Sequence, residues 1–188
     1  MNRLLGQSGS NGNNDLAIFI ALLRGINVGG SGLLAMKDLA ALCSTLGFHD
    51  VRTYIQSGNV VFASRKGEVA VRKTLTTALT KALGKPTDVA VRSAKEMAAV
   101  LKKNPFVKAP PAKVGVAFLG KRVTKTMLKA IDIPGKEEVA AGRREVYIHF
   151  PDGMGRSKLK LPKTFGPATV RNVNTVGKLA AMAEAEGG

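Results

Sequence analysis

The sequence predicts an α/β (α+β) protein of two ferredoxin-like βαββαβ subdomains in one structural unit. Three observations lead to this prediction. An uninterrupted apolar run at 16–24 suits a strand that is buried on both faces. Two hairpin patterns, at 51–64 and 137–150, each follow a segment with helical spacing of apolar residues. A proline-rich segment at 104–113 separates two stretches of similar element order.

The first half shows its elements clearly. Apolar residues from Met36 onward fall at helical spacing until Gly47, which is followed by Phe48, a pattern typical of a helix C-terminus. Two β-rich segments flank Gly58 and predict a hairpin in which this glycine takes a positive φ. The expected elements are, in chain order, a strand at 16–24, a helix at 36–46, a hairpin at 51–64, a helix at 71–82 ended by Gly84, and a strand at 88–93.

A capping box opens the helix that connects the halves, with Ser93 as the N-cap and Glu96 three residues later. Beyond it the order repeats less regularly, because Pro162 limits any helix in the glycine-rich basic loop 151–166. The second-half elements are a strand at 114–119, a short helix at 124–131, a hairpin at 137–150 about Gly142, a strand at 167–172, and a helix at 175–186 that Asn174 caps. The predicted domains are a disordered tail at 1–15, a first subdomain with the connecting helix at 16–103, a Pro-rich linker at 104–113, and a second subdomain with the C-terminal helix at 114–188.

Composition narrows the class of protein. The formal net charge is +16 over 188 residues, which either attracts an anionic partner or only provides a solvated basic surface. No apolar run reaches the roughly 18 residues that cross a bilayer, so we expect no membrane partner. Cys43 is the only cysteine, which excludes an internal disulfide and predicts a cytoplasmic location. The two histidines fall in different halves without other ligands nearby, so we expect no metal and no cofactor.

Polar residues of the first half are expected to meet at one end of its sheet. In a split βαβ unit, the loop after the first strand and the hairpin between the next two strands emerge at the same end, which places 25–32 beside 56–59. A cation, amide groups, a hydroxyl and glycine backbone N–H groups suit an anion there. Alternatively, these side chains only satisfy the backbone of the two loops. The candidate ligand-binding residues are Arg24, Gly25, Asn27, Gly29, Gly30, Ser57 and Asn59.

Known phosphate-binding motifs do not fit this loop. The segment 25–30 has the glycine spacing of a P-loop, but Ser31 and Gly32 stand where that motif needs lysine and a hydroxyl residue. In the second half the same geometry gathers a basic edge, formed by Lys121, Arg122, Lys125, Arg143 and Arg144. The residues that could serve as a general acid or base are His49, Asp50, Tyr147, His149 and Asp152.

The segments "ALLRGINVGG", "LGFHDVRTYIQSGNVVF", "VRS", "NPF", "YIHFPDGMGRSKL" and "ATVRNVNTVGKLA" together resemble a bacterial family called domain of unknown function 1697. The resemblance covers about residues 16–184. It implies two ferredoxin-like subdomains and no established activity. The family's motif positions fall on Arg24, Gly25, Asn27, Gly29, Gly30, Gln56, Ser57, Gly58, Asn59, Asp152, Gly153, Ser157, Arg171, Asn172, Asn174 and Thr175.

The resemblance extends the candidate site to the start of the last helix, with Arg171, Asn172, Asn174 and Thr175 as further ligand-binding residues. The chain also departs from the family. Val173 stands where the family has tryptophan, the usual lysine near Ser31 is missing, and the segment between "SKL" and "RN" is shorter.

Three functions remain open from the sequence. The first is a module that binds a phosphorylated small ligand or a nucleic-acid backbone through the Gly/Asn/Ser loops. The second is an enzyme for a small anionic substrate, with its site between the subdomains. The third is a scaffold for protein interactions. The chain has 7 Phe, 2 Tyr and no Trp. It therefore offers few aromatic side chains on which nucleic-acid bases could stack.

Overall fold

The computed structural model describes residues 16–26 and 34–185. The elements of its first half are β1 (Ala17–Leu23), α1 (Met36–Thr45), β2 (His49–Tyr54), β3 (Asn59–Ser64), α2 (Glu68–Leu83) and β4 (Val89–Ser93). These strands form an antiparallel sheet in the order β2-β3-β1-β4, which is the ferredoxin-like order. The predicted fold class is confirmed.

The second half follows helix α3 (Ala94–Lys102) and a 3₁₀ turn at Pro111–Lys113. Its elements are β5 (Val114–Leu119), α4 (Lys125–Lys129), β6 (Glu138–Ala141), β7 (Glu145–His149), β8 (Ala168–Asn172) and α5 (Val173–Glu184). The sheet order β6-β7-β5-β8 repeats that of the first half. Between β7 and β8, however, the chain forms only two 3₁₀ turns, Met154–Arg156 and Lys163–Phe165, and Pro162 directly precedes the second.

Local signals set the ends of several helices. Gly47 follows α1 with φ +78° and Gly84 follows α2 with φ +65°, so both glycines take the left-handed conformation that ends a helix. Ser93 and Glu96 form the predicted capping box of α3. The cap predicted for the last helix is wrong: Asn172, not Asn174, accepts the Thr175 N–H at 2.8 Å, and α5 begins at Val173.

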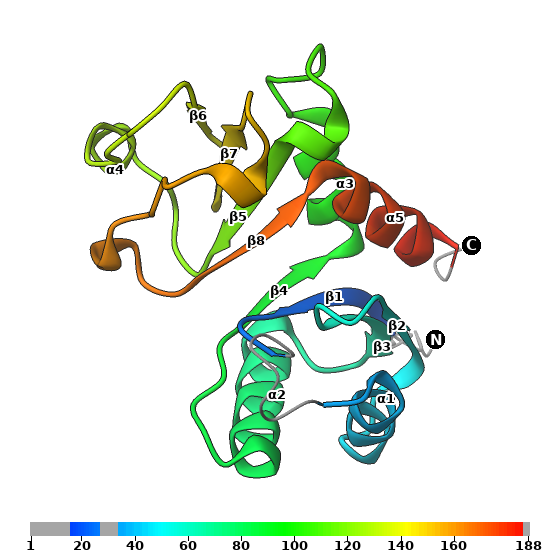
Figure 1. The fold of residues 1–188 in the computed structure, drawn as a ribbon. Helices are drawn as coiled ribbons and strands as arrows, with labels where there is room; N and C mark the ends of the chain where they lie inside the picture. Colours follow the sequence, from blue (N-terminus) through cyan, green and yellow to red (C-terminus); the bar gives the residue numbers. More distant parts are fainter. Residues whose placement is uncertain (1–15, 27–33, 186–188) are drawn as a thin grey trace, which may run out of the picture.

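Helices α3 and α5 lie between the two sheets and pack against each other (Figure 1). They share a central core with one face of each sheet, where Ile20 and Val61 from the first sheet and Phe118 and Tyr147 from the second are buried. Helices α1 and α2 cover the opposite face of the first sheet. The outer face of the second sheet carries its own apolar cluster, which includes Phe165. Burial on this scale in a shared core stabilises both halves together.

The two sheets approach each other at their edge strands β4 and β8 (Figure 1). Each edge strand runs directly into one of the central helices, β4 into α3 and β8 into α5. The two halves are therefore arranged in a similar way about this contact. None of the helices in the described ranges is both long and apolar enough to span a membrane.

Candidate functional site

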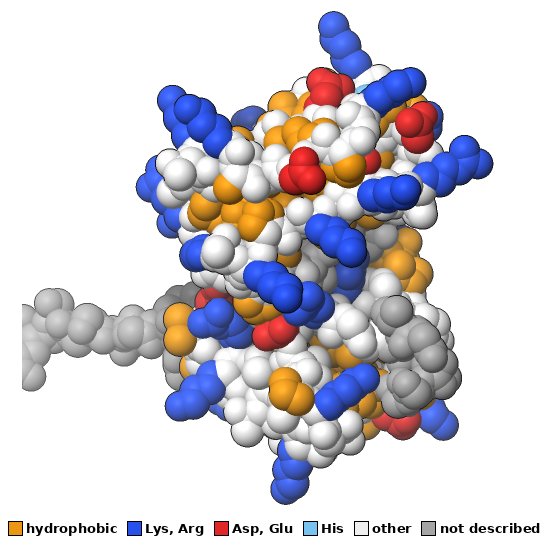
Figure 2. Space-filling model, turned by 60° about the vertical axis from the view of Figure 1, so that its left-hand side comes forward, with side chains coloured by type: hydrophobic (Ala, Val, Ile, Leu, Met, Phe, Trp, Pro, Cys, Tyr) orange, Lys and Arg blue, Asp and Glu red, His pale blue; other side chains and the backbone are white. Residues whose placement is uncertain are grey.

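Two clefts flank the contact between β4 and β8. The first, which we call the Arg24 groove, has a volume of about 730 Å³ and lies between Arg24 at the end of β1 and segment 159–170 of the second half. The second, the Arg92 cleft, has a volume of about 510 Å³ and lies between α2, β4 and the end of β5. Asp88 and Pro167 line both clefts. Figure 2 shows lysine and arginine side chains gathered around the waist between the two halves.

Arg171, in β8, reaches across this junction into the first half. Its Nε donates to Asn59 Oδ1 at 2.6 Å, and its Nη2 donates to the carbonyl oxygens of Leu23 and Ser57, both at 2.8 Å. Its Nη1 donates to the carbonyl oxygen of Val170 at 3.0 Å. All of these acceptors are neutral, and burial lowers the pKa of Arg171 to about 10.

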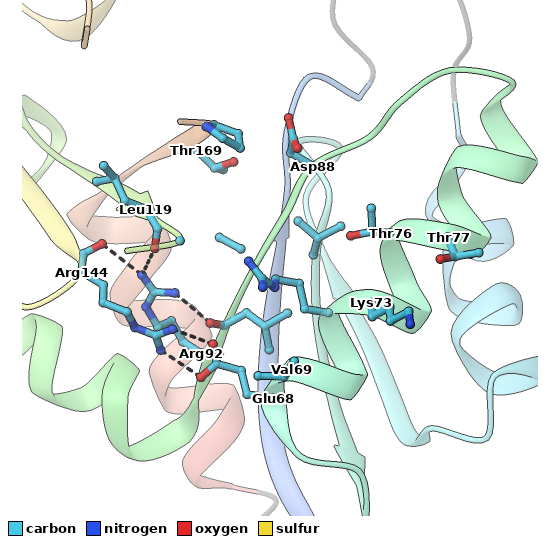
Figure 3. Close-up of a pocket in the computed structure, with 16 residues that line it drawn as sticks. Glu68, Val69, Lys73, Thr76, Thr77, Asp88, Arg92, Leu119, Arg144 and Thr169 are labelled. Atoms are coloured by element: carbon cyan, nitrogen blue, oxygen red, sulfur yellow. Dashed lines mark hydrogen bonds and ion pairs between the residues drawn. The ribbon is translucent and has the colours of Figure 1, made fainter. Parts of the chain in front are cut away.

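Arg92, in β4, makes the corresponding contacts with the second half. Its Nη2 donates to the carbonyl oxygens of Leu119 at 2.9 Å and Arg144 at 3.1 Å, and its Nη1 donates to that of Val91 at 2.8 Å. Its Nε donates to the Glu145 carboxylate at 2.8 Å. Burial lowers the pKa of Arg92, and the negative charge of Glu145 opposes this shift. Figure 3 shows the hydrogen bonds of Arg92 with the carbonyl groups of Val91, Leu119 and Arg144 at the wall of the Arg92 cleft, opposite Thr76 and Thr77 of α2.

The two arginines occupy equivalent places in the fold. Each comes one residue before the N-cap of the helix that follows its edge strand, Ser93 for α3 and Asn172 for α5. Each donates to the carbonyl at the end of the other half's first strand and to a carbonyl of the other half's hairpin. These reciprocal hydrogen bonds join the halves at both sides of the β4–β8 contact.

The two arginines differ in one contact: the side chain that pairs with Nε is charged for Arg92 and neutral for Arg171. Glu145 is the first residue of β7 and pairs with Arg92, whereas Asn59 is the first residue of β3 and pairs with Arg171. The Arg92 charge is thus neutralised by a buried carboxylate, with the two side chains only 2% and 6% exposed. Within the described ranges no carboxylate pairs with Arg171. Arg171 therefore leaves a positive charge at the junction, next to the wall of the Arg24 groove at Val170.

Three residues predicted for the ligand site belong to this contact. Asn59 is fully buried, and its Nδ2 donates to the Tyr54 carbonyl at 2.9 Å and to Ser57 Oγ at 3.0 Å. The backbone N–H of Leu23 donates to the Gly58 carbonyl at 2.8 Å, so the end of β1 and the hairpin lie together, as the strand order predicts. The side chains of Ser57, Asn59 and Arg171 thus bind one another and the backbone.

Arg24 lies at the rim of the groove with its side chain 54% exposed. Its Nη1 is 3.4 Å from Asp88 Oδ2, and its backbone N–H donates to the Asp88 carbonyl at 2.9 Å. Gly25 follows with φ +64°, and a Cβ built there meets no atom within 4 Å. The remaining predicted loop residues, Asn27, Gly29 and Gly30, lie outside the described residues.

The second predicted segment, at the start of α5, contributes mainly to the fold. Asn172 caps the helix and Thr175, which donates to it, is buried. Asn174 is exposed. Val173 packs against the central core. Of residues 171–175 only Arg171 is charged; it does not itself line the groove, but the neighbouring Val170 does.

The charge of the basic edge predicted in the second half is partly neutralised by ion pairs. Arg144 binds Glu68 at 2.6 and 2.9 Å and Glu96 at 2.7 Å, and these carboxylates raise its pKa. Lys121 Nζ donates to the Thr164 carbonyl at 2.7 Å. The loop 120–123 and the hairpin 142–144 do lie together, because the Val123 N–H donates to the Arg143 carbonyl at 2.9 Å.

Two of the predicted acid–base candidates are engaged in other contacts. The Tyr147 hydroxyl donates to the Val100 carbonyl at 2.8 Å, and burial raises its pKa to about 12. His149 Nδ1 lies 3.0 Å from Glu138 Oε1. Burial also raises the pKa of the Cys43 thiol to about 12, which keeps it protonated. No group of three or more metal-binding side chains occurs within 16–26 and 34–185.

Sequence reasoning missed the part of the groove that the second half supplies. Lys160 and Lys163 line it beside the apolar side chains of Ile148, Phe150 and Val170. Both lysines are exposed, and their side chains form no hydrogen bond or ion pair with other described residues. The alternation of lysine and leucine at 158–161 is the signal that could have found this wall, since it gives an extended segment one basic and one apolar face.

The fold and the arginine contacts define an α/β protein of two ferredoxin-like halves, which are joined by reciprocal hydrogen bonds and have a groove lined by basic residues between them. The chain belongs to the family of proteins of unknown function DUF1697, whose model matches residues 16–147. No curated protein matches the chain. It is similar in fold to a solved structure, that of the conserved bacterial protein SP0830 from Streptococcus pneumoniae, with a TM-score of 0.73 and 22% sequence identity over 90% of this chain and 99% of the other.

Proposed function

We propose that the protein binds a phosphate-bearing ligand in the Arg24 groove. The observation that carries this proposal is the Arg171 charge, which is partly buried against neutral acceptors where the equivalent Arg92 has a carboxylate. A partly buried cation without a counter-ion loses part of its hydration, which costs free energy. A bound anion would supply the missing negative charge, and the fold leaves the adjacent groove open to receive it.

The lining of the groove supports the same ligand class. Arg24, Lys160 and Lys163 contribute positive charge, and Asp88 is the one acidic side chain among the lining residues. The apolar wall formed by Ile148, Phe150 and Val170 suits a ring or another apolar group of the same ligand. A volume of about 730 Å³ is in the range of small-molecule sites.

The sequence-predicted residues then divide into two roles. In this proposal Arg24 contacts the phosphate directly, Asn27 supplies an amide hydrogen bond, and Gly25, Gly29 and Gly30 allow close approach of the backbone. Asn59 and Ser57 position Arg171, which acts through its charge rather than by contact. Asn172 and Thr175 do not contact the ligand in this proposal; their hydrogen bond only fixes the start of α5.

Removal of the two groove lysines is expected to weaken phosphate binding about tenfold, because each lost cation removes part of the attraction. The measurement is calorimetric titration of wild type and K160Q/K163Q with inorganic pyrophosphate, adenosine 5′-monophosphate and an oligothymidylate of about 12 nucleotides. The control is K81Q/K129Q, which removes the same charge from exposed lysines of α2 and α4 that line neither cleft.

The probes also separate the two sources of phosphate. A nucleic-acid backbone gives an affinity for the oligonucleotide that falls steeply between about 50 and 200 mM salt, whereas a small ligand gives a shallow dependence. An equal loss in both double variants, or no binding of any probe, would contradict the proposal.

A further inference from the structure

A third pocket, unconnected to the Arg24 groove, lies between α3 and the β6–β7 hairpin. It has a volume of about 410 Å³ and shares no lining residue with the groove. We call it the α3 pocket. Its walls are residues 95–103 of α3 and residues 143–147 of the hairpin and β7.

One face of α3 forms the first wall. Lys95, Ala99 and Lys103 recur every four residues and therefore lie along one side of the helix. The small Ala99 side chain leaves space between the two lysines. Both lysines are exposed, and neither side chain forms a hydrogen bond or ion pair within the part of the chain that the structure describes.

The floor and the opposite wall complete an apolar space with a basic rim. Val100 is 5% and Tyr147 is 1% exposed, and their mutual hydrogen bond occupies the tyrosine hydroxyl. Arg143 lies on the far side of the pocket with its side chain 77% exposed, and its only described ion pair is a long one, 3.9 Å from Glu96.

The two carboxylates of the lining are already neutralised. Glu96 binds Arg144 at 2.7 Å and accepts the Ser93 N–H at 3.1 Å, and its pKa is lowered: burial raises it, but the hydrogen bond from Ser93 and the charge of Arg144 outweigh that effect. Glu145 binds Arg92 at 2.8 Å and accepts the Arg144 N–H at 2.9 Å. A ligand in the pocket therefore faces three cations and no free carboxylate.

We infer that the α3 pocket binds a small aromatic anion, with its ring against Ala99, Val100 and Tyr147 and its negative group between the side chains of Lys95, Lys103 and Arg143. The space is small but still within the range of ligand sites. An apolar floor with cations at its rim favours a ligand that has a flat apolar ring and a negative group at one end. This site does not depend on the proposed function of the Arg24 groove.

The test compares 2-naphthoate with its neutral amide, 2-naphthamide, by calorimetric titration of the full chain. We expect the carboxylate to bind about tenfold more tightly than the amide in the wild type, and about equally in K95Q/K103Q. We expect Ala99→Leu, which fills the pocket and suits a helix, to weaken both ligands about tenfold.

A charge-matched control keeps the outcome specific. K81Q/K102Q removes the same charge from exposed lysines outside the pocket and should leave both affinities unchanged. Circular dichroism and thermal unfolding confirm that each variant is folded. Equal affinity for carboxylate and amide in the wild type, no effect of Ala99→Leu, or no binding of either compound would overturn the inference.

Discussion

Glu145→Gln is expected to lower the free energy of unfolding by about 3 kcal/mol, because breaking a buried ion pair leaves the other charge uncompensated. Arg92 and Glu145 are among the most buried charged side chains in the structure. The glutamine keeps an oxygen that accepts from Arg92 Nε, so the loss falls at the low end of the range for such pairs. The measurement is urea unfolding followed by circular dichroism.

The control for this prediction is Glu138→Gln, which removes the same kind of charge from an exposed partner of His149. An exposed pair of this kind contributes less than about 1 kcal/mol. A loss below about 1 kcal/mol for Glu145→Gln would show that Arg92 does not need its carboxylate. The missing carboxylate at Arg171 would then give no reason to expect an anion there.

The second large effect concerns binding. Asn59→Asp gives Arg171 the carboxylate that Arg92 already has, and we expect it to weaken pyrophosphate binding about tenfold by cancelling the charge beside the groove. The aspartate retains an oxygen for Arg171 Nε, although it loses the two hydrogen bonds that Asn59 donates. Calorimetric titration measures the affinity, and urea unfolding confirms that the variant is folded.

Asn104→Asp is the matched control, because it makes the same chemical change outside both clefts and keeps the oxygen that accepts the Phe106 N–H. It should bind pyrophosphate as the wild type does. If Asn59→Asp also retains full affinity, the Arg171 charge has no part in binding.

The reciprocal arginine contacts explain why the two sheets form one unit. Each half supplies the arginine that satisfies carbonyl groups at the end of the other half's first strand and in its hairpin. In an isolated half these carbonyl groups would lose their arginine donors and be left to water. The shared core around α3 and α5 adds apolar burial to the same junction.

Periodicity and turn residues were sufficient to predict the strand order, and with it the meeting of the β1 loop and the β2–β3 hairpin. They could not predict that Arg171 would meet Asn59, because these residues are 112 positions apart and belong to different sheets. The similar segments "VRS" at 91–93 and "VRN" at 170–172, each followed by a helix, are the sequence sign that Arg92 and Arg171 occupy equivalent places. The cap of α5 was misplaced because asparagine occurs at both 172 and 174, and only the end of β8 decides between them.

The groove itself depends on tertiary placement. Lys160 lies outside any helix or strand and Lys163 begins a 3₁₀ turn, so the short alternation at 158–161 is the one local sign of this wall. Pro162 indicated that the second half could not repeat helix α2 there, and the 3₁₀ turns confirm it. The segment forms a basic and apolar wall instead, and its position opposite Arg24 follows from tertiary contacts that local sequence does not encode.

The most direct test uses the two equivalent arginines as probe and internal control. Proton–nitrogen correlation spectra that resolve the Nε–Hε signals of Arg171 and Arg92 are recorded while pyrophosphate is added. A saturable shift of the Arg171 signal with a stationary Arg92 signal is the expected result. Parallel movement of both signals, or a stationary Arg171 signal while pyrophosphate binds elsewhere, would contradict the central claim that the unpaired guanidinium makes this groove the anion site.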